Sequence, residues 1–211
     1  MKDQNKTNFD EKAATWDENP LRVKLAHDVA EAIIREIKPT RDMDALEYGC
    51  GTGLVTLRLQ PFVKSITGVD SSPGMLDVIK EKVKNQGLQN VRTQFVDFEQ
   101  NGKVDGKFHL VISCMTLHHL REPGVLFRPL YDLLLPGGYL GISDLDKEGG
   151  LFHDDNTGVF HFGFDRVHLK KLLEKTGFRE VRDITAATVV KNVTGKGERK
   201  FPVFLIIGKH R

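Results

Sequence analysis

Apolar residues recur along this chain in two patterns, one typical of amphipathic helices and the other of buried strands. In the segment 22–37 the apolar positions fall at helical spacing, and Pro39 follows as a stop signal. Short apolar runs at 44–48 and 65–70 predict buried strands, and the segment 54–62 between them is predicted to be a helix. The alternation continues with helices expected over 71–87, 124–135 and 165–177 and strands expected over 91–97, 108–115 and 139–145.

Strands that alternate with helices favour a mainly parallel sheet, because each parallel pair needs a crossover and the helix supplies it. The last two β-rich runs, 181–190 and 201–210, have only a basic, glycine-containing turn between them, so we expect them to pair as an antiparallel hairpin. The predicted fold class is therefore α/β: a Rossmann-like, doubly wound, seven-stranded sheet, mostly parallel with an antiparallel last strand.

Three glycines set two apart follow the first predicted strand. Gly49, Gly51 and Gly53 stand where the chain turns from strand to helix, near the switch point at which open α/β sheets bind ligands. The dinucleotide fingerprint is GxGxxG, whereas this loop has GxGxG with Leu54 in place of the last glycine. Asp70 ends the second predicted strand, a position from which an acid accepts hydrogen bonds from a ribose diol. The residues alone leave two interpretations open, a tight turn or a loop that a ligand approaches closely.

Five segments together resemble one family. The segments "LEYGCGTG", "GVDSSPGML", "VDFE", "LVISCMTLHHL" and "LLPGG" occur in the order and at the intervals of the class I S-adenosylmethionine-dependent methyltransferases, and they cover Leu46 to Gly138. The resemblance implies S-adenosyl-L-methionine as cofactor and methyl transfer as activity. We expect a single methyltransferase domain over 1–211, divided into an N-terminal helical lid region (1–40), a cofactor-binding core (41–146), a substrate-side insert (147–164) and a last helix with terminal hairpin (165–211).

The resemblance assigns the glycine loop to the methionine end of the cofactor. Gly49, Gly51 and Gly53 would let the loop pass beneath the methionyl and ribose parts. Glu47 would orient the loop and, through water, the methionyl ammonium. Cys50 lies within the loop, where we expect a buried, inert thiol rather than a nucleophile.

The nucleoside end of the cofactor would be held by the next two strand ends. By the same resemblance, Asp70 would bind the ribose hydroxyls, and Ser71 and Met75 would line the adenine side. Asp97 would accept a hydrogen bond from the adenine exocyclic amine, with Phe98 beside the ring.

The fourth predicted strand leads to the expected acceptor side. Ser113 would offer its carbonyl to the cofactor amino group, and the "HHL" segment follows where the family's acceptor pocket opens. His118, His119 and His161 are candidate general bases, because imidazole has a pKa suited to removing a proton from an acceptor hydroxyl. His118 and His161 are also candidate substrate contacts, as is Trp16, whose "F…WD" segment resembles one that covers the cofactor in this family. A packed or hydrogen-bonded wall residue is the alternative for each.

Composition and absent motifs narrow the acceptor to a small molecule. The 211 residues are 39% hydrophobic and 28% charged, and a net charge of +2 is too small to favour nucleic acid or a membrane surface. No apolar run approaches the roughly 20 residues that span a bilayer, and the first residues have no apolar h-region, so we expect a cytoplasmic protein. The [DNS]PP[YFW] motif with which relatives grip planar amines is replaced by "SCMT".

Eight histidines raise the question of a metal, because three groups could converge: His118-His119, His153-Asp154-Asp155 and His161. Adjacent histidines such as His118 and His119 are expected to diverge, and no recognised ligand spacing such as HxxxH occurs, so no metal site is expected. Cys50 and Cys114 form no CxxC pair and fit a reducing compartment. Two alternatives remain: a nicotinamide-dependent oxidoreductase, which shares the strand-turn-helix and Asp70, and a non-catalytic S-adenosylmethionine-binding module. The sequence leaves the methylated atom and the oligomeric state open.

Overall fold

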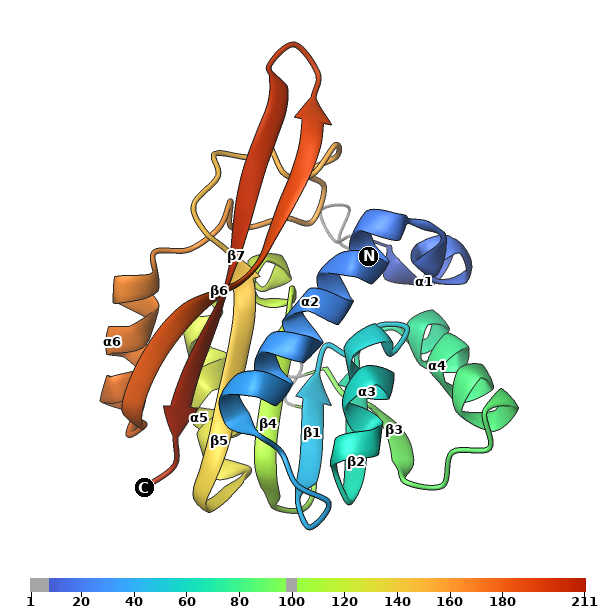
Figure 1. Ribbon diagram of the computed structural model, residues 1–211, viewed down its shortest axis with the longest axis vertical. Coiled ribbons are helices and arrows are strands. Elements are labelled where there is room, and N and C mark those ends of the chain that lie inside the picture. The colour runs from blue at the N-terminus through green and yellow to red at the C-terminus, as the bar shows by residue number, and fades with distance from the viewer. Residues whose placement is uncertain (1–7, 98–101) are drawn as a thin grey trace.

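The apolar runs form one seven-stranded sheet in a computed structural model that describes residues 8–97 and 102–211 (Figure 1). The strands lie in the order β3-β2-β1-β4-β5-β7-β6. From β1 the chain moves outward to β3 and then returns to β4, so the switch point lies between β1 and β4. The strand bounds are β1 Asp44–Tyr48, β2 Ser65–Asp70, β3 Val91–Phe95, β4 Phe108–Cys114, β5 Leu134–Leu145, β6 Arg179–Val193 and β7 Gly197–Lys209.

The strand directions confirm the predicted fold class. The pairs β3–β2, β2–β1, β1–β4 and β4–β5 are parallel, and β7 runs antiparallel between β5 and β6. The central strands are apolar on both faces, as expected where helices cover both sides of a sheet. Ala45, for example, is buried and lies in register with Ile66 on one side and Leu110 on the other.

Helices cover both faces of the sheet, and each face has its own hydrophobic cluster. α2 (Pro20–Ile37) and α3 (Leu54–Leu59) pack on one face, and α5 (Gly124–Asp132) and α6 (Arg166–Thr176) pack on the other. α4 (Pro73–Asn85) contacts β2 and β3. Local signals explain the helix starts: Asn19 and Asp165 accept hydrogen bonds from the first-turn amides of α2 and α6, and Pro20 occupies the first position of α2.

Two predicted boundaries need correction. The helix expected over 124–135 ends at Asp132, because the buried Leu134 pairs with Phe108 and already belongs to β5. The hairpin strands are longer than the runs 181–190 and 201–210, and Figure 1 shows the far end of the hairpin extending beyond the rest of the sheet. In the described ranges, every helix is too short or too polar to reach across a bilayer.

Candidate cofactor and acceptor site

A cavity of about 340 Å³ lies at the carboxyl ends of β1, β2 and β4, in the size range of small-molecule sites. Residues from far apart in the sequence meet there: the glycine loop after β1, the segment after β4, the N-terminal part from Phe9 to Val29 and the insert before α6. The predicted cofactor-binding residues that line it are Glu47, Gly49, Cys50, Gly51, Asp70, Ser71, Met75 and Asp97.

The three glycines of the loop have two different roles: two allow close packing of the protein, and one allows close approach of a ligand. A Cβ at Gly49 would lie 2.3 Å from Thr116 Oγ1, and one at Gly53 would lie 2.4 Å from Ile79 Cδ1, so both positions exclude a side chain by contact with the protein itself. A Cβ at Gly51 would have only Met75 Sδ, at 4.0 Å, as a neighbour, and Gly51 lines the cavity. Both interpretations of the loop therefore apply, one to its ends and the other to its middle.

Asp70 fastens this loop to the end of β2. Its Oδ2 accepts from the Gly51 amide at 2.8 Å and its Oδ1 from the Ser72 amide at 2.9 Å. Burial raises the pKa of this carboxyl, while the amide hydrogen bonds oppose the shift. An ionised carboxylate has about four lone-pair sites, so the group can hold the loop through its amide hydrogen bonds and still accept from a diol in the cavity.

Glu47 is a buried carboxyl at the floor of the cavity, 2% exposed, and it accepts a hydrogen bond from the Thr56 hydroxyl. Burial raises its pKa to about 8, which keeps the group largely protonated at neutral pH when no cation is near. A ligand that carries a sulfonium and an ammonium would favour its ionised form. Together with the open face of Gly51 and the carboxyl of Asp70, the residues fit S-adenosylmethionine.

Not every predicted cofactor residue reaches the cavity. Gly53 packs on Ile79, as above, and Ser113 is fully buried within β4, with Met115 lining the cavity further along. Met115 has a φ of +53°, a strained conformation for a residue with a side chain. Phe98 lies outside the described residues. Burial raises the pKa values of the Cys50 and Cys114 thiols, which fits the inert role expected for Cys50.

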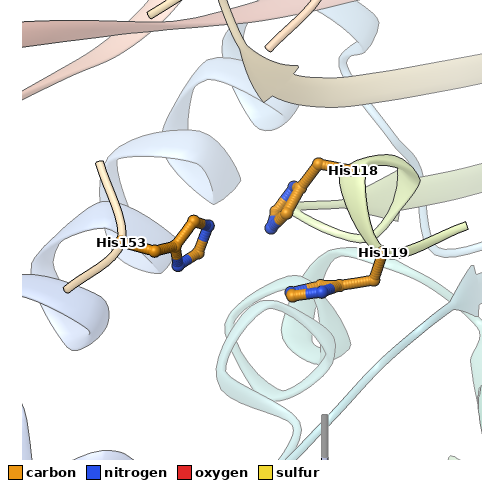
Figure 2. A group of neighbouring side chains, drawn as sticks. All are labelled: His118, His119 and His153. Atoms are coloured by element: carbon orange, nitrogen blue, oxygen red, sulfur yellow. The ribbon is translucent and has the colours of Figure 1, made fainter. Parts of the chain in front are cut away.

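Three histidines also line the cavity (Figure 2), and the part of the wall that they form is called the histidine end below. His118 and His119 lie on the 3₁₀ turn η4 (Leu117–His119), and their ring centroids are 4.1 Å apart. The expectation that they diverge is wrong, because successive side chains in such a turn are about 120° apart rather than on opposite faces as in a strand. The third ring, His153, comes from the insert, and its centroid lies 5.1 Å from that of His118.

Two of these rings are fixed by hydrogen bonds. Nδ1 of His118 lies 2.8 Å from Oδ1 of Asp144, and both residues are at most 1% exposed. Nδ1 of His119 lies 2.8 Å from the Gly158 carbonyl. Sequence reasoning missed Asp144 as a site residue, although an acid within the apolar run of β5 was a signal for it. His153 was considered only as part of a metal group that was then rejected.

His161 does not line the cavity, so the structure does not bring it to the other predicted site residues. Its Nε2 lies 3.2 Å from the Arg121 carbonyl, and its ring packs on Phe164 with a centroid distance of 5.3 Å. The insert instead contributes His153.

The N-terminal segment closes one side of the cavity. Trp16, on the 3₁₀ turn η1 (Ala13–Glu18), and Phe9, on α1 (Phe9–Lys12), both line it, and Phe9 meets the His119 ring edge-on at 5.0 Å. Asp10 accepts from the Ser72 hydroxyl at 2.6 Å, and Asp17 accepts from the Thr52 hydroxyl at 2.6 Å, so the segment is tied to the loops that follow β1 and β2.

The fold and this cavity define a class: Rossmann-like α/β domains with a ligand site at the carboxyl ends of the parallel strands. Residues 45–138 match a family model described as a methyltransferase domain. An uncharacterized methyltransferase of Schizosaccharomyces pombe is 33% identical over 135 residues, which cover 57% of this chain and 48% of that protein. A ubiquinone biosynthesis O-methyltransferase of Coxiella burnetii is 29% identical over 129 residues, 61% of this chain and 51% of that protein.

A solved S-adenosylmethionine-dependent methyltransferase from Aquifex aeolicus has the same fold, with a TM-score of 0.69 and 22% identity over 96% of this chain and 98% of that one. Residues 45–138 thus match a methyltransferase domain, and the chain is similar in sequence and in fold to S-adenosylmethionine-dependent methyltransferases, whose cofactor is S-adenosylmethionine. The chain spans about half the length of the curated relatives it matches.

Proposed function

We propose that this protein transfers the methyl group of S-adenosylmethionine to a small-molecule acceptor bound against the three histidines. The observation that carries the proposal is a single cavity lined by two chemically distinct groups of residues, here called its two ends. One end has the Gly51 backbone with the carboxyls of Glu47 and Asp70, and the other has His118, His119 and His153.

The cofactor supplies a methyl group already activated by the sulfonium charge. Transfer is an in-line displacement in which a lone pair of the acceptor forms the new bond to carbon while the carbon–sulfur bond breaks. The protein has to align the two reactants and exclude water. Asp70 would hold the ribose, the loop around Gly51 would lie beneath the methionyl part, and Trp16 with Phe9 would cover the opening.

An oxygen acceptor must also lose its proton, and the histidine end supports that step. Asp144 holds the orientation of the His118 ring through the hydrogen bond at Nδ1. The name of the Coxiella burnetii relative describes an O-methyltransferase, which supports an oxygen atom as the acceptor here. The match to a methyltransferase domain gives no support to a nicotinamide-dependent oxidoreductase, and demonstrated methyl transfer would remove the non-catalytic alternative.

The test is incubation of the full chain with S-adenosylmethionine labelled in its methyl group and a metabolite extract, followed by mass spectrometry of the low-mass products. A His118→Gln variant is the matched control, because glutamine can still donate to Asp144 but cannot act as imidazole does. A labelled small molecule that forms with the wild type and not with the variant supports the proposal. Label found only in protein or nucleic acid would contradict the small-molecule acceptor.

A further inference from the structure

The three histidines at the acceptor end form a cluster with metal-binding geometry (Figure 2). One ring nitrogen from each of His118, His119 and His153 lies within 4.8 Å of the others. Figure 2 shows the rings approaching a shared space from different sides, two from η4 and one from the insert.

The hydrogen bonds of the cluster fix which nitrogens face that space. A carboxylate and a carbonyl can only accept, so Nδ1 of His118 donates to Asp144 and Nδ1 of His119 donates to the Gly158 carbonyl. In neutral imidazole, Nε2 of both rings then carries a lone pair. A carboxylate or carbonyl behind each imidazole is the usual outer shell of a histidine metal ligand, because it sets the tautomer and the ring orientation.

A second observation points to a ligand at this place. His118 is 1% exposed, and its Nε2 has no hydrogen-bond partner among the described residues. The same holds for the buried Nε2 of His153 within those residues. An unsatisfied buried acceptor costs about 1–3 kcal/mol, so two of them side by side in one cluster need an explanation.

Charged side chains of both signs surround the cluster. Asp144 places a buried negative charge behind His118. Two cations face His153: Lys191, which is paired with Asp154 at 2.8 Å, and Arg22, whose guanidinium stacks on the Trp16 ring at 4.0 Å.

We propose that His118, His119 and His153 bind a zinc ion and leave its fourth coordination position open to the cavity. Three imidazoles with one open position are a ligand set of catalytic zinc sites. Zinc–nitrogen bonds of about 2.0–2.1 Å bring tetrahedral ligands to about 3.3 Å from one another, so binding draws nitrogens that now lie within 4.8 Å of one another closer by up to about 1.5 Å. Because His153 lies on the insert rather than on a helix or strand, it can make most of that movement.

The open position gives the zinc a role in the proposed reaction. A hydroxyl or thiol of the acceptor that binds there loses its proton near neutral pH, since the ion lowers the pKa of a bound group. The proton passes to solvent, and the lone pair left on the acceptor attacks the methyl carbon as the carbon–sulfur bond breaks. This role rests on the proposed methyl transfer, whereas zinc binding itself does not.

The experiment measures metal binding apart from catalysis. The full chain is stripped of metal, titrated with zinc by calorimetry, and loaded with cobalt for visible absorption. The expected result is one zinc per chain and the strong visible bands of tetrahedral cobalt. His153→Ala and His119→Gln should each weaken zinc binding by about 100-fold or more, and Asp144→Asn by about 10–100-fold, the range for an outer-shell partner. His168→Ala, at an exposed position of α6, is the matched control and should bind as the wild type does.

Two variants from different elements guard against loss by misfolding, and far-ultraviolet circular dichroism confirms that each is folded. Equal zinc affinity in the wild type and in folded His153→Ala and His119→Gln would overturn the site. So would an octahedral cobalt spectrum. Zinc binding without methyl transfer to any acceptor would support the metal site and overturn the proposed function, so the two failures are distinguishable. Full turnover by the metal-free protein would overturn the role in activating the acceptor.

Discussion

The glycine-loop end and the histidine end of the cavity differ in how far apart in the sequence their residues lie. The glycine-loop end comes from two short stretches, 47–53 and 70–75, that follow neighbouring parallel strands, and its contacts are mainly to backbone atoms. The histidine end joins η4 to Asp144, 26 residues away, and to Gly158, 39 residues away. A cofactor site can thus be a local motif, whereas an acceptor site is assembled from side chains that only the complete fold brings together.

That difference explains which parts of the fold and of the site could be predicted from the sequence. Local periodicity and turn chemistry predict the strands, their parallel or antiparallel directions and the glycine loop. Asp70 lies where the motif places it. The end of α5 and the start of β5 near Leu134 could not be predicted from local periodicity, because the pairing of Leu134 with Phe108 outweighs the helical pattern. The role of Gly53 was also missed, since its packing partner Ile79 belongs to another helix.

The histidine end could be predicted only in part. The segment after β4 marked His118 and His119, since ligand sites lie at strand ends. The convergence of His153 depends on the path of a long insert with no regular pattern, and His161 from the same insert points to the Arg121 carbonyl instead. Residue type alone could not separate the two.

The largest expected effect comes from a substitution that disrupts only the histidine end. His118→Gln should lower kcat by about 10²–10⁴, because it removes the imidazole that meets the acceptor or its metal, while affinity for S-adenosylmethionine stays within about twofold. Turnover is measured with the acceptor that the labelled extract identifies, and affinity by calorimetry. His168→Ala serves as the exposed control. Near-normal turnover in a folded His118→Gln protein would remove His118 from the reaction.

The next largest effect comes from a substitution that disrupts only the glycine-loop end, where the cofactor binds. Asp70→Ala should weaken S-adenosylmethionine binding by about 1.5–3 kcal/mol, roughly 10–150-fold, because it removes a charged acceptor and releases the Gly51 amide. Zinc affinity should not change, since Asp70 is no part of the histidine cluster. Calorimetric titration with each ligand checks both statements. Unchanged cofactor affinity would show that Asp70 only holds the loop.

A smaller effect concerns the pH dependence of the cofactor end. The pKa of Glu47 is about 8 without ligand, and a bound cation lowers it, so binding releases a proton below pH 8. Affinity should therefore rise by at most about tenfold per pH unit between neutral pH and 8, then level off. Titrations in two buffers of different ionisation enthalpy measure the proton released. Glu47→Gln should abolish the dependence that comes from the protein, and an unaltered profile would exclude Glu47.

The same raised pKa of Glu47 makes the stability of the cofactor-free protein fall as the pH rises, whereas cofactor affinity rises. Between the ordinary value of about 4.5 and the folded value of about 8, the folded state holds a proton that the unfolded chain has lost. The contribution of Glu47 to the free energy of unfolding is thus complete below pH 4.5 and is lost as the pH rises toward 8. Thermal unfolding of the wild type against Glu47→Gln over this range shows the difference.

The smallest effect concerns the cover over both ends. Asp17→Ala removes the acceptor of the Thr52 hydroxyl and of Lys82, and it should weaken cofactor binding by about 0.5–1.5 kcal/mol, roughly two- to tenfold. Limited proteolysis should cut the N-terminal segment faster in this variant. Asp28→Ala, which loses only an exposed pair with Lys24, is the control. Equal affinity and equal cleavage would show that the segment does not act as a cover.

The most direct test of the central claim, that one cavity holds the cofactor methyl group against the three histidines, is a magnetic resonance measurement. S-adenosylmethionine with an isotope-labelled methyl group is bound to the full chain loaded with zinc and, separately, with cobalt. Unpaired electrons on cobalt broaden and shift only nearby nuclei, so we predict a sharp methyl resonance in the zinc form and a shifted, broadened one in the cobalt form. The same resonance in both forms, with cofactor and metal bound, would contradict the account.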